Sequence, residues 1–303
     1  MSSRETMQGW ARRLTSAAEM PDPFRSSYEE LALASSNFPV VLYSPEFGHG
    51  RYREAAKLLV LLDDRLVCFG LERRGVVRAE LSMADIHTAQ WGTVLLHSWL
   101  RFQGPVNHDA SCIHVDFNTV CFDLYLPVLQ EHLGRIYAGC EGNVRDERAK
   151  FDGLLRSDYK FMNLGRDALE PGMEVRKFLL QSRLERRFLH FLRWTMLPGV
   201  MLIVTQRELI VVSEGYDQHE SEYATVWTYL RRDSIERMWA DTAVLRGEVV
   251  HHLRVAMRGG YSTAASFAGS RGEEIAEVID LCAASSGSGL VVPEVRLVGR
   301  SGS

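Results

Sequence analysis

The sequence predicts an α+β fold, mainly β, in which one antiparallel unit occurs twice. The first observation is a pair of similar stretches, residues 58–69 and 201–212. In each, an apolar run meets a short polar turn containing arginine, and a leucine opens the next apolar run. Runs of this kind, bounded by polar turns, indicate β-hairpins. The second observation is that each half of the chain ends in one amphipathic helical pattern. A repeated order of elements points to a duplicated unit.

Length and composition are those of a soluble protein with two domains. The chain has 303 residues, of which 46% are hydrophobic and 24% charged, and its formal net charge is −4. This balance gives no basic field for nucleic acid. The first 20 residues lack the apolar core of a secretory signal, and no apolar run reaches the ~18 residues that a bilayer crossing needs. Five widely spaced cysteines without a CxxC pair favour a reduced, cytoplasmic protein without disulfides or zinc.

The expected organisation has five parts. Residues 1–37 form a helical lead-in, residues 38–139 the first unit, residues 140–169 a charged linker, residues 170–284 the second unit, and residues 285–303 a flexible tail containing Gly and Ser. The lead-in is predicted to be helical because Trp10, Leu14 and Ala17 recur at helical spacing. A partly disordered arm is the alternative. Within the tail, the apolar segments 290–292 and 295–298 could add to an exposed sheet edge.

Each unit is predicted as a series of strands followed by one helix. In the first unit, strands are expected at 39–43, 57–71 as a hairpin, 76–81, 84–91, 94–102 and 112–117, and a helix from near Pro127 to residue 137. In the second, strands are expected at 173–181, 184–192 (or a helix there), 201–212 as a hairpin, 222–230, 234–239, 244–246, 249–257 and 262–267, and a helix at 273–284. Aligning the halves places Asp85-Ile86 beside Ser234-Ile235, and residues 112–117 beside 253–257.

This order of elements resembles the pleckstrin-homology-like (PH-like) superfold, including its GRAM-like members, as a bacterial-type tandem. The family carries a T-x-x-R-L pattern in the hairpin turn. Here the turn is Thr205-Gln206-Arg207-Glu208-Leu209, one residue out of step, and Asp63-Asp64-Arg65-Leu66, which lacks the threonine. The resemblance implies that each unit is a bent antiparallel sheet, or partly open barrel, closed by its C-terminal helix. It also implies a binding scaffold that presents loops to lipid head groups, or grooves to protein partners.

The most basic segment lies in the first strands of the second unit. Its candidate anion-binding residues are Arg176, Lys177, Arg183, Arg186 and Arg187. Similarity to lipid-binding PH-like domains, together with the fit of arginine to phosphate, predicts a surface for anionic phospholipid. The alternative is a solvated strand face whose basic side chains pair with acidic neighbours. The corresponding stretch of the first unit has fewer basic residues.

Two groups of histidines are the remaining candidates for chemistry. His108-Asp109 and His114 with Asp116 are candidate metal or acid–base groups, and His114 and Asp116 alternate along a strand and so share a face. No third ligand is spaced to join them, and structural polar groups are the favoured alternative. No nucleophile elbow, phosphate-binding loop or dinucleotide fingerprint occurs.

The functional expectation is therefore a non-enzymatic interaction or scaffold module without cofactor or metal. It would bind a partner protein or a second copy of itself, and no nucleic acid. The alternatives are a peripheral binder of anionic membrane that uses the basic strand, and an enzyme with an unrecognised site.

Overall fold

The computed structural model describes residues 10–31, 38–49, 52–105, 112–188, 192–215 and 224–286. It divides into two compact units, unit 1 with residues 1–132 and unit 2 with residues 133–303. The expected α+β, mainly β, class is confirmed. The paired strands are antiparallel, and no sheet in the described ranges closes into a barrel. No helix in these ranges combines the length and the apolar character needed to cross a membrane.

Unit 1 contains two antiparallel sets of strands. The first has the order β1 (Arg12–Leu14), β2 (Val40–Ser44), β5 (Lys57–Leu61), β6 (Arg65–Glu72), β7 (Gly75–Ser82). The second consists of β8 (Thr88–Val94), β9 (His97–Gln103) and β10 (Cys112–Asn118), with β9 in the middle. The short hairpin of β3 (Phe47–His49) and β4 (Tyr52–Glu54) follows β2.

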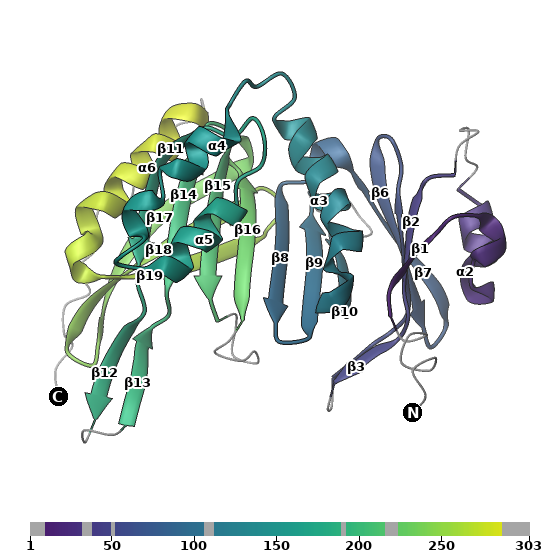
Figure 1. Cartoon of the computed structure of the whole chain (residues 1–303), viewed down its shortest axis with the longest axis horizontal. Helices are drawn as coiled ribbons and strands as arrows, with labels where there is room; N and C mark the ends of the chain where they lie inside the picture. Colours follow the sequence, from purple (N-terminus) through teal and green to yellow (C-terminus); the bar gives the residue numbers. More distant parts are fainter. Residues whose placement is uncertain are drawn as a thin grey trace. The chain divides into compact units, whose positions relative to one another are not determined.

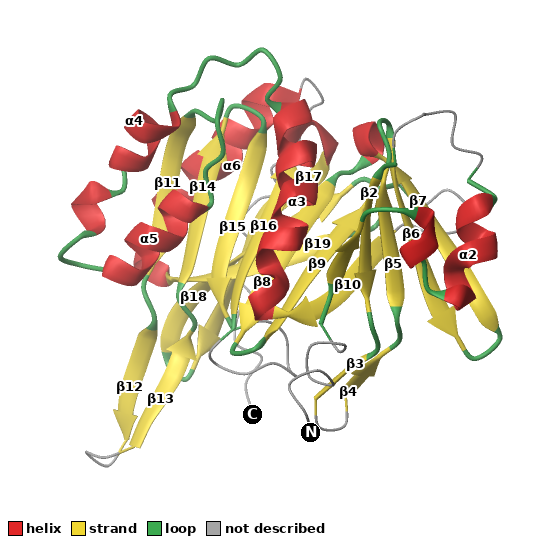
Figure 2. Ribbon diagram, turned by 45° about the vertical axis from the view of Figure 1, so that its right-hand side comes forward, coloured by secondary structure: helices red, strands yellow, loops and turns green. Residues whose placement is uncertain are grey.

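The helical segments of unit 1 cover these strands. They are η1 (Ala17–Glu19), α2 (Asp22–Glu29), η2 (Met83–Asp85), η3 (Thr119–Cys121) and α3 (Phe122–Ile136), which runs across the boundary into unit 2. The helix α2 lies against β6 and β7 (Figure 2). Its Phe24 and Tyr28 join Leu14 in a buried cluster with residues of β2, β5 and β6. On α3, Tyr125 stacks on Phe117 of β10 with ring centroids 4.0 Å apart.

Unit 2 repeats this plan. Its first set of strands has the order β11 (Val175–Gln181), β14 (Val200–Thr205), β15 (Glu208–Glu214), β16 (Thr225–Arg231). Its second set consists of β17 (Ile235–Leu245), β18 (Glu248–Met257) and β19 (Ser262–Ala268). The hairpin of β12 (Leu184–Phe188) and β13 (Leu192–Leu197) lies between β11 and β14 in sequence. The helical segments are α4 (Val144–Ala149), η4 (Asp152–Leu154), α5 (Tyr159–Asp167), η5 (Arg232–Ser234), η6 (Gly269–Arg271) and α6 (Gly272–Ser286).

The core of unit 2 lies between its two sets of strands and under α6. The helix contacts β11, β14 and β17 (Figure 1). Its Ile275, Val278 and Ile279 are buried in one cluster with apolar side chains from both sets of strands, among them Leu202 and Phe267. Neither set of strands alone encloses these side chains, so the helix completes the burial.

The two units share one order of elements: a strand, a short hairpin, three strands, a 3-10 turn, three strands, a 3-10 turn and a helix. The alignment of Asp85-Ile86 with Ser234-Ile235 agrees with this order, since both follow the fourth long strand at η2 and η5. The match of residues 112–117 with 253–257 is wrong. The strand β10 directly precedes the closing helix, so its counterpart is β19, not β18.

Two other sequence expectations differ from the structure. Trp10, Leu14 and Ala17 do not share a helix, because Arg12–Leu14 is the strand β1, which pairs with β2 and buries Leu14. Tertiary pairing here overrides a weak helical pattern. The closing helix of unit 1 begins at Phe122 instead of near Pro127, because η3, capped by Asn118, leads directly into it. The strand expected at 184–192 is confirmed over Leu184–Phe188, which is β12 and pairs with β13, and the helix given as its alternative does not form over these residues.

Candidate functional site

The basic residues predicted to bind anions lie on the first strands of unit 2. Arg176 and Lys177 are on β11, Arg183 is in the turn after it, and Arg186 and Arg187 are on β12.

The two residues on β11 are paired with carboxylates. The Nη2 atom of Arg176 lies 3.0 Å from Oε2 of Glu174, and Lys177 forms an ion pair with Glu277 of α6. Their positive charge is therefore partly neutralised within the protein.

Arg183 belongs to a more buried cluster around Glu214. Its Nε donates to Glu214 Oε2 at 3.0 Å, Lys160 Nζ donates to Oε1 at 2.6 Å, and the backbone N–H of Gly199 donates to Oε2 at 3.2 Å. Burial alone would raise the pKa of the Glu214 carboxyl, but the hydrogen bonds from Lys160 and Arg183 outweigh it and lower the pKa. The cluster fixes the entry to β12, so Arg183 has a structural role in this arrangement.

Arg186 donates from Nη1 to the backbone oxygen of Arg246 at 3.3 Å. The backbone of Arg187 pairs with Arg193, while its side chain lies outside the described part of the structure. Each of the four described basic side chains thus has its own acceptor, on a different part of unit 2.

Among the histidine candidates, His114 and Asp116 lie together on β10. Asp116 is buried. Its Oδ1 lies 2.8 Å from Nε2 of His97 on β9, and its Oδ2 lies 2.7 Å from Nε2 of His114, without hydrogen-bond alignment at Oδ2. Lys57 Nζ lies 4.0 Å from Oδ2 and 2.8 Å from Glu54. Burial alone would raise the pKa of Asp116, but His114, His97 and the charge of Lys57 lower it well below its usual range.

The chemistry open to this cluster is limited by how its nitrogens are used. Arg101 Nε donates to Nδ1 of His114 at 3.0 Å, so the proton of a neutral His114 is on Nε2, facing Asp116. His97 also directs Nε2 to the carboxylate. Both imidazoles therefore direct Nε2 at the carboxylate, His97 through a hydrogen bond and His114 through a close contact. The arrangement is that of a buried ionic network.

His108 and Asp109 lie outside the described residues. Within the described ranges, no group of three or more His, Cys, Asp or Glu side chains is arranged to hold a metal ion. His97 was missed because it lies 19 positions before Asp116 and meets it only through the pairing of β9 with β10. His97 could have been identified only from the register between these two strands.

The turn between β8 and β9 exposes two leucines. Leu95 and Leu96 are 77% and 66% exposed, and Val120 of η3 is 59% exposed. The turn is held in place by Thr119, whose backbone N–H donates to Leu96 O at 3.0 Å and whose hydroxyl lies 2.9 Å from that of Ser98. Leu95 has a φ of 52°, a conformation that is unfavourable for leucine.

The equivalent turn of unit 2 lies between β17 and β18. Here the cross-strand pair of Val244 and Val249 is 71% and 48% exposed, beside Leu245. Arg246 in this turn has a φ of 53°. Within the described residues, Leu95 and Arg246 are the two non-glycine residues with positive φ. Both units therefore place exposed aliphatic side chains and one strained residue at the turn between their fifth and sixth long strands.

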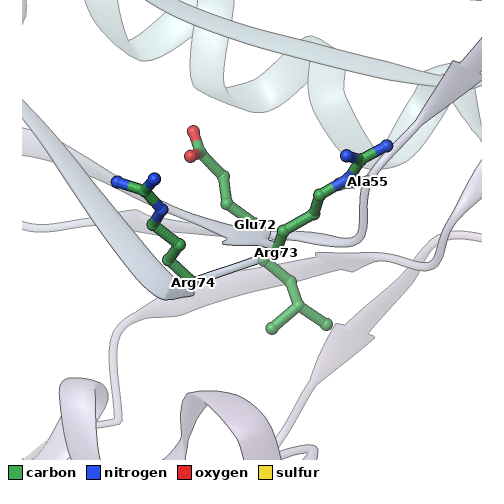
Figure 3. Close-up of a pocket in the computed structure, with 5 residues that line it drawn as sticks. Ala55, Glu72, Arg73 and Arg74 are labelled. Carbon is green, nitrogen blue, oxygen red and sulfur yellow. The ribbon is translucent and has the colours of Figure 1, made fainter.

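A pocket of about 500 Å³ opens on unit 1 and is lined by Ala55, Leu71, Glu72, Arg73 and Arg74. Figure 3 shows the side chains of Glu72, Arg73 and Arg74 directed apart from one another around this space. The two arginines form the turn between β6 and β7 and are exposed. Sequence reasoning treated this turn as a connection only, because the proximity of Ala55 becomes visible in the folded chain.

A second buried carboxyl lies in the hairpin turn of unit 2. Glu208 is fully buried and its Oε2 accepts a hydrogen bond from the hydroxyl of Tyr137 at 3.0 Å. The Tyr137 hydroxyl also lies 2.7 Å from that of Thr205, which accepts from the N–H of Glu208 at 2.9 Å. Burial raises the pKa of Glu208 to about 8. Glu208 is therefore mostly protonated at neutral pH, and its side chain and N–H join this turn to Tyr137 and Thr205.

Comparison of the chain with models of known protein families gives no match, and a search of curated proteins finds no significantly similar sequence.

Proposed function

We propose that this protein is a non-enzymatic interaction module built from two PH-like units, each closed by its C-terminal helix. The shared order of elements supports the PH-like assignment, because four strands, three strands and a helix recur in both units. The interpretation of each unit as a bent, partly open barrel is part of the same proposal.

The observation that carries the binding function is the pair of exposed aliphatic turns. A hairpin turn of two residues ordinarily favours Asn and Gly, which are polar or small and adopt positive φ easily. Unit 1 has Leu95 and Leu96 there, both largely exposed. The turn thus combines backbone strain with exposed apolar area, neither of which favours folding. A partner protein that buries these leucines would account for both features.

The alternative of an anionic membrane has less support. Arg176, Lys177 and Arg183 contact carboxylates, so each would have to exchange an internal acceptor for a phosphate. The enzymatic alternative would rest on His97, His114 and Asp116, whose facing nitrogens and oxygens are engaged with one another.

The test is a capture experiment with the full chain and the variant Leu95→Asn/Leu96→Gly. Asn tolerates the positive φ of position 95, and Gly at the exposed position 96 removes the second leucine, so the variant is expected to keep the fold. Immobilised proteins are incubated with an extract of the producing cells, and bound proteins are identified by mass spectrometry. The control is Val77→Asn, which removes a 45% exposed valine from β7 of the same unit.

We expect at least one protein to be retained by the original chain and the control and lost from the variant. Sedimentation velocity of the same three proteins reports whether that partner is a second copy of the chain. Identical capture by all three would contradict the proposal. Binding of the original chain to anionic vesicles, with no protein captured, would favour the membrane alternative.

A further inference from the structure

We propose that the pocket of unit 1 lined by Arg73 and Arg74 binds an acidic side chain on a segment of a partner protein. This site is separate from the aliphatic turns, and it rests on the proposed function only in that its ligand belongs to a protein.

The two guanidinium groups are available to a ligand. Within the described part of the chain, neither Arg73 nor Arg74 makes a hydrogen bond or an ion pair. Two other arginines of the same sheet differ, because Arg65 and Arg78 both contact Glu80. Burial alone would raise the pKa of Glu80, but the bonds from these two arginines lower it, as expected for a carboxylate between two cations. Among the described residues, the two cations of the pocket are therefore not paired with its one carboxylate, Glu72, whereas Arg65 and Arg78 are both bound to Glu80.

The backbone holds the two arginines in a tight turn. Glu72 pairs directly with Gly75 across the hairpin, which leaves Arg73 and Arg74 as the two turn residues. Gly75 has a φ of 131°, which side chains other than glycine rarely tolerate, so the turn depends on glycine there. The backbone N–H of Leu71 donates to Ala56 O at 2.9 Å, which joins this end of β6 to the segment that provides the opposite wall. The cations are therefore presented from a fixed backbone.

The other lining residues indicate the type of anion. Ala55 and Leu71 give the pocket an apolar part, which suits the methylene groups of an acidic side chain. Glu72 adds a carboxylate to the same pocket and would repel a phosphate dianion more strongly than a single carboxylate. The space of about 500 Å³ is open to solvent, and Glu72, Arg73 and Arg74 are exposed, so a side chain can enter it while attached to a longer segment.

These features together favour a peptide segment. Arginine forks bind carboxylates through two parallel hydrogen bonds. A peptide can offer an Asp or Glu to either guanidinium group, since Figure 3 shows the two directed apart, and a backbone N–H or a basic side chain to Glu72. A bilayer of anionic lipid presents phosphates without a matching donor for Glu72.

The experiment measures fluorescence anisotropy of a labelled peptide with four glutamates between glycines, titrated with the full chain. The matched peptide has glutamine in place of glutamate. Two further arms use inorganic phosphate as a competitor and co-sedimentation with phosphatidylglycerol vesicles. The test variant is Arg73→Ser/Arg74→Ser. Its control, Arg145→Ser/Arg156→Ser, removes the same charge from exposed positions of unit 2.

We expect the glutamate peptide to bind and the glutamine peptide to bind at least roughly tenfold more weakly, as charge-assisted hydrogen bonds predict. The Arg73→Ser/Arg74→Ser variant should lose at least roughly tenfold in affinity, while the control should stay within about twofold. The variant Arg73→Lys/Arg74→Lys keeps the charge but not the two parallel donors of a guanidinium. Its affinity for the glutamate peptide should lie between those of the double-serine variant and the original chain.

Several results would overturn the inference. These are no binding of the glutamate peptide at millimolar concentration, an equal loss in both double-serine variants, or equal binding of the two peptides. Binding of phosphate or vesicles without the peptide would assign the pocket to another anion. The Leu95→Asn/Leu96→Gly variant should bind the peptide normally, so failure of the pocket and failure of the aliphatic turn are distinguishable.

Discussion

Asp116 in unit 1 and Glu208 in unit 2 are both buried carboxyl groups, yet their surroundings shift the pKa in opposite directions. Asp116 faces two imidazoles and Lys57, and its pKa is lowered. Glu208 receives one hydroxyl hydrogen bond from Tyr137, while its buried Oε1 has no hydrogen-bond partner among the described residues, and its pKa rises to about 8. Burial acts against the charged form in both cases, so the number of donors and cations decides which form is stable.

The largest expected effect on the free energy of unfolding comes from removing the ionised carboxylate, Asp116. Asp116→Ala leaves His97, His114 and Lys57 around an empty buried site and should reduce the free energy of unfolding by about 3–5 kcal/mol. Urea unfolding at pH 7 measures this. Glu80→Ala, which removes a 32% exposed partner of two arginines, should cost no more than about 1 kcal/mol. Equal losses in the two variants would show that the cluster around Asp116 gives no special stabilisation.

A second prediction concerns pH. A folded carboxyl whose pKa is raised binds its proton more tightly than the unfolded chain does. The stability contributed by Glu208 is therefore complete below 4.5, the ordinary pKa of a glutamate in the unfolded chain, and is lost as pH rises toward about 8. The slope should approach about 1.4 kcal/mol for each pH unit. Glu208→Gln keeps the shape without the titration, so its free energy of unfolding should fall less steeply between pH 5 and pH 8. Parallel curves for the two proteins would refute the raised pKa.

Asp116 should show the opposite dependence. Its stabilising effect is present above 3.8, the ordinary pKa of an aspartate in the unfolded chain, and is lost as pH falls further. Acid unfolding of the original chain and of Asp116→Asn, followed from pH 5 to pH 2, measures this. The Asn variant should be less sensitive to acid. An unchanged acid transition would mean that other carboxyl groups control it.

The smallest of these effects is expected for Tyr137→Phe. The variant removes the hydroxyl that joins Glu208 to Thr205, and should cost about 1–2 kcal/mol. The loss should grow above pH 8, because an ionised Glu208 needs that donor more than a protonated one. Thermal unfolding at pH 6 and pH 9 provides the measurement. An equal loss of stability at both pH values would show that the hydrogen bond from Tyr137 does not depend on the ionisation of Glu208.

The repeated fold could be predicted because apolar strands and amphipathic helices leave a local pattern in the sequence. The 201–212 hairpin and the last helix were found in this way. The sites were less accessible. His97 reaches Asp116 only through strand register, and Glu208 is a polar turn residue that the folded chain buries. Likewise, the 3-residue strand β1 is too short for its pattern to be separated from that of a helix.

The turn before Glu208 also holds both ends of the long segment between Ile136 and Gly172. Arg207 donates to the backbone oxygen of Ile136, and Gln206 Nε2 donates to that of Gly172 at 2.6 Å. Because adjacent residues of one turn fasten both ends, the segment that includes α4 and α5 forms a closed loop on unit 2. A cut at the exposed Arg156 would therefore leave each end of the segment bonded to the same turn, Ile136 through Arg207 and Gly172 through Gln206.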